Sequence, residues 1–238
     1  MTGLLIAAIV LAAAFVQSLS GFGFAIVVMP LLTLLLGIRT AAPLVAVTAL
    51  TVYVINVARF RRAINGAEVL RLGLSSALGV PMGIWIVSNA DATLVKQALG
   101  LLLILFALYS LARPAAAWTL SPRWVYPAGF LAGCLGGAYN TPGPPAIVYG
   151  TLRQWPRDEF RACLQTLFLV NGLLVVASHL VAGHLTAPVL TYCLYTVPAL
   201  ALGILLASRV DSRVDRERFR TLVTVMILLL GLSLVLSW

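Results

Sequence analysis

Ten apolar segments, separated by short polar or glycine-rich stretches, follow one another along nearly the whole chain. They cover residues 3–19, 22–36, 42–58, 69–88, 94–112, 124–138, 143–152, 160–182, 187–207 and 219–237. A helix needs about 20 apolar residues to cross the hydrocarbon core of a bilayer, and several segments reach that length. Only 10% of the 238 residues are charged. The chain is therefore predicted to be an all-α polytopic membrane protein without a separate soluble domain.

The basic residues gather on one side if the chain changes sides after each segment, and only Arg39 and Lys96 fall on the other side. The other 14 of the 16 basic residues are Arg59, Arg61, Arg62, Arg71, Arg113, Arg123, Arg153, Arg157, Arg161, Arg209, Arg213, Arg216, Arg218 and Arg220. Cytoplasmic loops carry such an excess, so we predict a cytoplasmic arginine-rich side with both termini outside. The net charge of +9 then indicates topology and not nucleic-acid binding.

The seventh segment, 143–152, is too short to cross the bilayer, because ten residues of helix extend only about 15 Å. It is therefore interpreted as either a short span or part of a re-entrant hairpin. The charge count does not choose between ten spans and six spans with two hairpins, formed by the first and second and by the sixth and seventh segments.

The two halves of the sequence resemble each other. Phe15–Gly21 (FVQSLSG) is similar to Leu131–Gly137 (LAGCLGG), and each run is followed by a short segment and an arginine-bearing loop. Each half has five segments, an odd number, so the halves should enter the membrane from opposite sides as inverted repeats. We predict one repeat over 1–112, a connecting loop over 113–123 and a second repeat over 124–238.

Glycine, proline and small polar residues interrupt the apolar pattern at 18–24 (SLSGFGF) and at 136–145 (GGAYNTPGPP). Irregular backbone at membrane depth must pack in protein or line a wet cavity, and each stretch precedes a short helix whose N-terminal N–H groups attract anions. We predict two halves of a substrate site that meet near the membrane midplane, with packing turns as the alternative. The candidate residues are Gln17, Ser18, Ser20, Gly21, Phe22, Gly23, Phe24, Gly137, Tyr139, Asn140, Thr141, Pro142, Gly143 and Pro144.

The pairing of FVQSLSGFGFAIVVMPLL with GGAYNTPGPPAIVYG resembles the TauE/SafE family, also called the toluene-sulfonate uptake permease family, and the resemblance covers nearly the whole chain. It implies a transporter in the bacterial inner membrane for sulfite, sulfonates or related sulfur-containing organic anions. The cargo and the direction of transport stay open.

Three further polar residues lie within apolar segments. Asn56 and Asn171 occupy similar places in the two halves, where each either lines the site or makes an interhelical hydrogen bond. His179 is considered for a proton-linked role because intramembrane ionisable groups are functional candidates, with packing as the alternative. None of the ten segments contains Asp or Glu, so no carboxylate proton relay is expected.

These features favour a secondary transporter or facilitator of a small anion that works by alternating access. An anion channel is the alternative, and an intramembrane hydrolase using Ser20 and His179 is a remote one. We expect no enzymatic activity, no cofactor and no bound metal. The expected partners are the anionic substrate and the lipid bilayer but no nucleic acid, and a homo-oligomer is left open.

Overall fold

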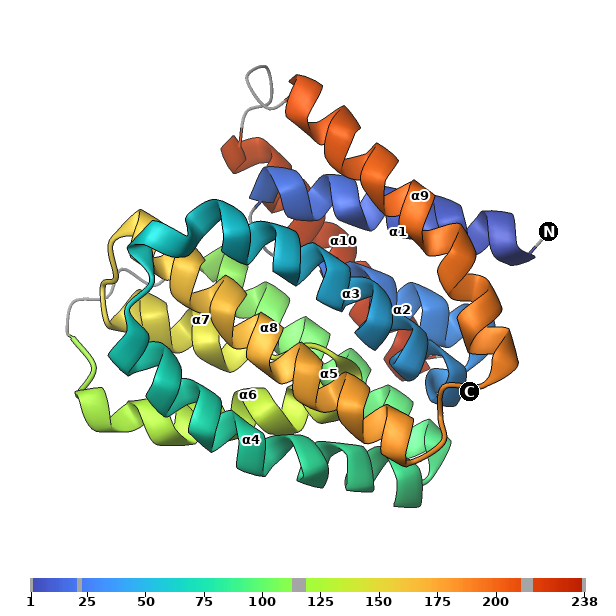
Figure 1. Ribbon diagram of the computed structural model, residues 1–238, viewed down its shortest axis with the longest axis horizontal. Coiled ribbons are helices and arrows are strands. Elements are labelled where there is room, and N and C mark those ends of the chain that lie inside the picture. The colour runs from blue at the N-terminus through green and yellow to red at the C-terminus, as the bar shows by residue number, and fades with distance from the viewer. Residues whose placement is uncertain (1, 21–22, 113–118, 211–215, 237–238) are drawn as a thin grey trace. The chain divides into compact units, whose positions relative to one another are not determined.

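The computed structural model describes residues 2–20, 23–112, 119–210 and 216–236, and these residues form helices without a strand (Figure 1). The α-helices are α1 Thr2–Ser20, α2 Phe24–Leu36, α3 Ile38–Phe60, α4 Gly66–Asn89, α5 Ala92–Ala112, α6 Val125–Tyr139, α7 Gly143–Leu152, α8 Arg157–Val181, α9 Ala187–Val210 and α10 Arg216–Leu236. Two 3-10 turns are added, η1 Arg61–Ala63 and η2 Pro122–Trp124. Each predicted apolar segment corresponds to one α-helix, so the all-α fold class is confirmed.

Six helices in the described part of the chain, α1, α3, α4, α5, α8 and α9, are long and apolar enough to cross a membrane. By contrast, α2, α6 and α7 have 13, 15 and 10 residues, which correspond to about 20, 22 and 15 Å at about 1.5 Å per residue. The α6–α7 pair therefore fits the predicted hairpin, whereas α1 has the length of a complete span. The choice between the two topologies stays a prediction.

Helix α4 shows how these helices meet a bilayer. Leu70, Leu74 and Leu78, spaced four residues apart, are 61–74% exposed. On another face Leu72, Ser76 and Val80 are fully buried. A protein in water rarely leaves such a leucine stripe uncovered, so this face is the one that contacts lipid. The chain is a multi-pass membrane protein.

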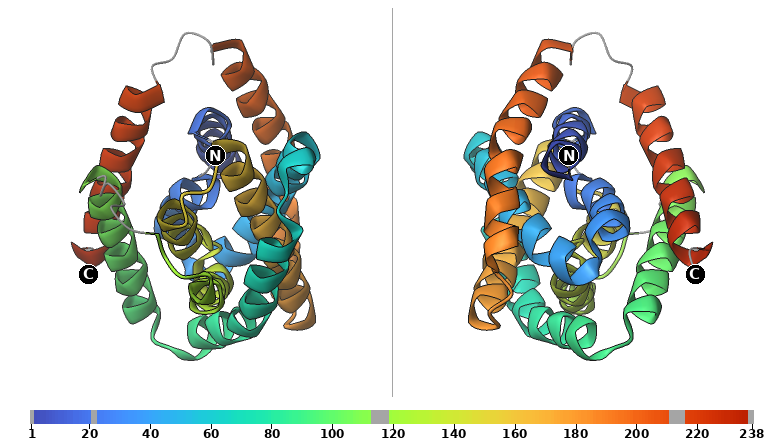
Figure 2. Two further views of the ribbon diagram at one scale, coloured as in Figure 1. Left: turned by 90° about the vertical axis from the view of Figure 1, so that its left-hand side faces the viewer. Right: turned by 90° about the vertical axis from the view of Figure 1, so that its right-hand side faces the viewer.

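The chain divides into two compact units. The first contains residues 1–48, 90–114 and 184–238, and the second contains 49–89 and 115–183. In the first unit α9 packs along α1 (Figure 1), and a Cβ added to Gly203 of α9 would lie 2.5 Å from the Leu11 carbonyl oxygen. Helix α10 lies beside α5 (red and green in Figure 2), where Gly100 and Gly231 face each other closely.

In the second unit α4 lies along α6 (Figure 1), and α8 packs against α4, α6 and α7. Glycines bring the α4 and α6 backbones together: a Cβ on Gly79 would lie 2.2 Å from the Phe130 carbonyl oxygen, and one on Gly133 would lie 2.2 Å from the Ser76 carbonyl oxygen. Small residues at such crossings are typical of membrane helix pairs. This interface holds α6 along the stretch that leads into the second break.

Helices from both halves of the sequence mix in each unit. The first helix of each predicted repeat packs on the fourth helix of the other, α1 on α9 and α6 on α4. Within each repeat the first helix also contacts the second, α1 with α2 and α6 with α7. Related repeats would produce this reciprocal pattern. The opposite orientation of the repeats and their boundaries stay predictions.

Candidate functional site

The first break joins α1 to α2 through a side chain. The backbone N–H of Phe24, the first residue of α2, donates a hydrogen bond of 2.9 Å to Oε1 of Gln17. Gly23, just before it, has φ 105° and ψ 0°, a left-handed conformation that glycine adopts without a Cβ penalty. Gln17 therefore caps α2 from seven residues away and fixes the helix start beside its own amide group.

The Nε2 group of Gln17 is a buried hydrogen-bond donor. Gln17 is only 2% exposed, and its Nε2 atom has no hydrogen-bond acceptor among the described residues. The N–H groups of Ala25 and Ile26 in the first turn of α2 also lack an intrahelical partner. Because an unsatisfied buried polar group costs about 1–3 kcal/mol, these donors are suited to a bound acceptor.

The second break, between α6 and α7, has the same kind of geometry. Asn140 ends α6 with φ 55° and ψ 24°, and asparagine is among the few non-glycine residues that tolerate this left-handed conformation. The Asn140 N–H donates to the Gly136 carbonyl at 2.8 Å, and the Thr141 N–H donates to the Leu135 carbonyl at 3.3 Å. These bonds satisfy the end of α6 and turn the chain towards α7.

Thr141 carries the unpartnered group of this second break. The residue is 1% exposed, and its Oγ1 atom has no hydrogen-bond partner in the described part of the chain. Helix α7 follows at Gly143, but Pro144 and Pro145 have no N–H, so only Gly143 and Ala146 supply donors in its first turn. Neither predicted stretch, 18–24 or 136–145, contains a charged residue.

Other predicted site residues have protein partners in the structure. A Cβ on Gly137 would lie 2.2 Å from the Val80 carbonyl oxygen, so this glycine lets α6 approach α4. Asn171 of α8 is 1% exposed and donates to the Ser76 hydroxyl at 2.7 Å. Asn56 of α3 donates to Oε1 of Gln165 at 3.2 Å. The bonds of both asparagines join helices, as the packing alternative requires.

The remaining candidates lie as follows. The Ser18 hydroxyl donates to the Ala14 carbonyl within α1 at 2.8 Å, and Ser20 is the last residue of α1. Tyr139 is buried at the end of α6, Pro142 precedes α7, and Pro144 is buried in its first turn. His179 is 4% exposed in the last turn of α8. Gly21 and Phe22 lie outside the described residues.

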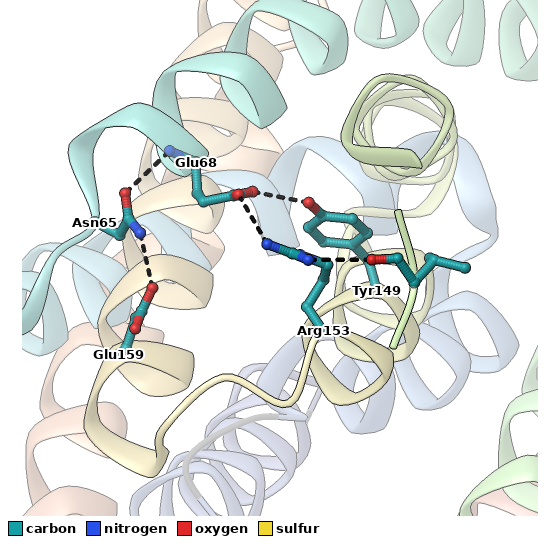
Figure 3. A network of polar contacts seen from close by, with 6 residues as sticks. Asn65, Glu68, Tyr149, Arg153 and Glu159 are labelled. Carbon is teal, nitrogen blue, oxygen red and sulfur yellow. Dashed lines mark hydrogen bonds and ion pairs between the residues drawn. The ribbon is translucent and has the colours of Figure 1, made fainter. Parts of the chain in front are cut away.

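A buried carboxylate corrects the expectation that the apolar segments hold none. Helix α4 begins at Gly66 and not at residue 69, so Glu68 lies in its first turn and is only 7% exposed. Tyr149 of α7 donates its O–H to Oε2 of Glu68 at 2.8 Å, and Arg153 lies 3.9 Å from Oε1 (Figure 3). The predicted apolar segment begins at residue 69, directly after Glu68, so the charge of Glu68 itself set the segment boundary and left the residue outside it.

The sequence matches the family Sulfite exporter TauE/SafE over residues 5–234. The match covers both breaks, all of the predicted site residues and the carboxylate cluster. No curated protein and no solved structure is detectably similar to the chain.

Proposed function

Because the chain belongs to the TauE/SafE sulfite exporter family, we propose that it is a secondary transporter for a small sulfur-containing anion, sulfite or a sulfonate, in a bacterial inner membrane. The observation that carries this proposal is the pair of buried donors at the two helix breaks, the Gln17 amide and the Thr141 hydroxyl, which lack protein partners in the described chain. Both lie beside helix N-termini, where anions are favoured.

The donors at each break, taken by themselves, suit a sulfur oxyanion. Sulfite and sulfonate groups present three acceptor oxygens around one centre, and amide, hydroxyl and backbone N–H groups can each donate to one oxygen. Neither break contains a fixed positive charge. An uncharged site binds an anion through hydrogen bonds alone, so the affinity should be moderate and the anion should be able to leave.

Alternating access is the transport mode that we propose. Its support is the reciprocal packing of α1 on α9 and of α6 on α4, which suits repeats that exchange roles. An anion channel would use the same donors with a continuous pore. Counterflow separates the two: a carrier accelerates the exchange of labelled anion when unlabelled anion is present on the other side, whereas a channel gives large single-channel currents. The arginine-rich loops are proposed to be cytoplasmic, with both termini outside.

Thr141→Val tests the site directly. It replaces a buried hydroxyl that has no partner among the described residues with a methyl group of similar volume, so the protein without bound anion should keep or gain stability. The matched control is Thr48→Val, because the Thr48 hydroxyl is also buried but donates to the Leu44 carbonyl at 2.8 Å. Thermal shifts of purified protein would be recorded with sulfite, thiosulfate, taurine, sulfoacetate, toluene sulfonate, sulfate and lactate at matched ionic strength.

We expect a sulfur anion to raise the unfolding temperature of the wild type and of Thr48→Val through preferential binding to the folded state. The same anion should shift Thr141→Val much less. Equal stabilisation of Thr141→Val and wild type would contradict the assignment of this break as a binding site. Wild-type protein that shows neither a shift nor counterflow with any of these anions would refute the proposed substrate class.

A further inference from the structure

We infer that Glu68 is a proton-binding site that couples the movement of protons to that of the anion. The inference rests on the proposed function, since it concerns the ion that drives the same transport. Glu68 lies buried in the first turn of α4, within a helix long and apolar enough to span the membrane, where ionisable groups are expensive and usually functional.

Both oxygens of Glu68 are engaged, but unequally. The Tyr149 hydroxyl donates to Oε2 at 2.8 Å, whereas the nearest Arg153 nitrogen stands 3.9 Å from Oε1 (Figure 3). Arg153 also donates through Nη1 to the Leu120 carbonyl at 3.1 Å, and its Nε atom is buried without a partner in the described chain. The positive charge of Arg153 therefore balances the Glu68 carboxylate only from a distance, and one of the guanidinium N–H groups makes no hydrogen bond within the described residues.

Arg153 forms an ion pair with Glu68, and Arg71 lies three residues further along α4. From α8, the Cys163 thiol lies within electrostatic range of the Glu68 and Glu159 carboxylates. Asn65 links the two acids, because its amide donates to Glu159 at 2.8 Å and its Oδ1 accepts from the Glu68 N–H at 3.3 Å (Figure 3). Helix α6, the other helix packed on α4, has no charged residue.

Helix α7 connects the contacts of Glu68 to the second helix break. It begins at Gly143, two residues after Thr141, and Tyr149 lies six residues further on, about 9 Å along the helix axis. Arg153 caps the same helix at its other end. Protonation of Glu68 removes the charge that attracts Arg153 and turns the Tyr149 bond from a charge-assisted bond into a neutral one. The hold of α4 on α7 therefore weakens when Glu68 takes up a proton.

Coupling follows from this connection. Suppose that α7 has one arrangement when the anion is bound and another when Glu68 is ionised. Binding of the anion then changes the affinity of the protein for the proton, and binding of the proton changes its affinity for the anion by the same factor. A purely structural role would be better filled by apolar residues, since replacing a buried ion pair by packed hydrophobic side chains is often neutral or stabilising. The pair is thus suited to switching.

The test uses wild-type protein and Glu68→Gln in proteoliposomes with labelled thiosulfate, which stays fully ionised between about pH 5.5 and about pH 8. Potassium and valinomycin hold the membrane potential at zero. With equal pH on both sides, wild type and Glu68→Gln should both exchange thiosulfate. An imposed pH gradient should change the net uptake of wild type several-fold but not that of Glu68→Gln. The control Asp158→Asn, an exposed acid at the start of α8, should respond as wild type does.

A second measurement does not depend on transport. Binding of thiosulfate to purified wild-type protein in weakly buffered detergent should change the pH of the solution, and Glu68→Gln should show no change. If Glu68→Gln does not insert, Tyr149→Phe decides, because it removes the hydrogen-bond donor that lies 2.8 Å from Oε2 of the carboxylate. The pH of half-maximal gradient-driven uptake should then differ from that of wild type.

The outcomes separate the two claims. Absence of thiosulfate exchange by wild type at equal pH would count against the proposed function. Exchange that ignores a pH gradient, a full gradient response in Glu68→Gln, or an unmoved pH midpoint in Tyr149→Phe would overturn the proton site alone. Loss of the response in His179→Gln but not in Glu68→Gln would transfer the role to His179 and would also overturn the inference.

Discussion

Gly79→Ala and Gly73→Ala form a matched pair that tests the close approach of α4 to α6. Both glycines are buried in the interior of α4. A Cβ on Gly79 would lie 2.2 Å from the Phe130 carbonyl oxygen and 2.7 Å from the Cys134 nitrogen, both backbone atoms. A Cβ on Gly73 would meet only a side-chain methyl group of Val170, at an ordinary contact distance of 3.6 Å.

The expected difference follows from these distances. Both substitutions gain the helix propensity of alanine over glycine, about 1 kcal/mol, and this gain cancels between them. Gly79→Ala must in addition move the α6 backbone by about 1 Å, and overpacking of this kind costs about 1–3 kcal/mol. Because backbone atoms cannot rotate away as a side chain can, we expect Gly79→Ala to be less stable than Gly73→Ala by that amount.

The assay is thermal unfolding of the two variants in the same detergent. For a chain of this length about 1 kcal/mol corresponds to roughly 2–4 °C, so Gly79→Ala should unfold several degrees below Gly73→Ala, while Gly73→Ala should match or exceed wild type. The displaced α6 also leads into Asn140 and Thr141, and Gly79→Ala should therefore bind the anion less tightly. Equal unfolding temperatures for the two variants would refute the argument that the α4–α6 approach requires glycine at residue 79.

Two smaller changes probe other contacts. Asn171→Leu removes the buried donor to the Ser76 hydroxyl and should lower the unfolding free energy by about 0.6–2 kcal/mol; a leucine variant as stable as wild type in denaturant titrations would show that the bond contributes nothing. Asp91 accepts hydrogen bonds from the backbone N–H groups of Leu94 and Thr93 at the start of α5, and these bonds lower the pKa of its carboxyl below the ordinary value of 3.8. The stabilisation from the ionised Asp91 carboxylate should thus be complete above about pH 4 and lost as the pH falls through the lowered pKa. Asp91→Ala should therefore have a lower unfolding temperature than wild type at neutral pH, and the difference should become smaller in acid. A difference in unfolding temperature that does not depend on pH would contradict this assignment.

The helices were predictable because apolar runs fix them. Every described α-helix matches a predicted apolar segment, and the largest shifts in starting residue come where polar residues open a helix, as at Ile38, Gly66 and Arg157. Bilayer physics makes long apolar runs helical, but it sets no sharp boundary in the polar zone at their ends. One such shift bears on the proposed proton site, because the earlier start of α4 includes Glu68 in the helix, where it is buried.

The breaks were predictable as breaks, but not the atoms in them. Glycine and proline in an apolar run predict an interruption of the helix. The hydrogen bond from the Phe24 N–H to Gln17, in contrast, depends on how α2 is placed against α1 after the break. The same holds for Gly137 and Asn171, which the sequence predicted as site residues and which lie at contacts between helices. A small or amide residue in an apolar helix suits either role, and only the neighbouring helix decides.

The separation of charge from the breaks has a physical reason. A fixed guanidinium at membrane depth would need a counter-charge when the anion is absent, and an unpaired buried charge costs several kcal/mol. Here the pair Glu68 and Arg153 lies at the far end of α7, while the donors near Thr141 are neutral. The proposed anion can then bind and dissociate without leaving a buried positive charge unpaired. In the proposed coupling, a proton at Glu68 still changes the energy of the proposed anion site, because α7 connects the two ends.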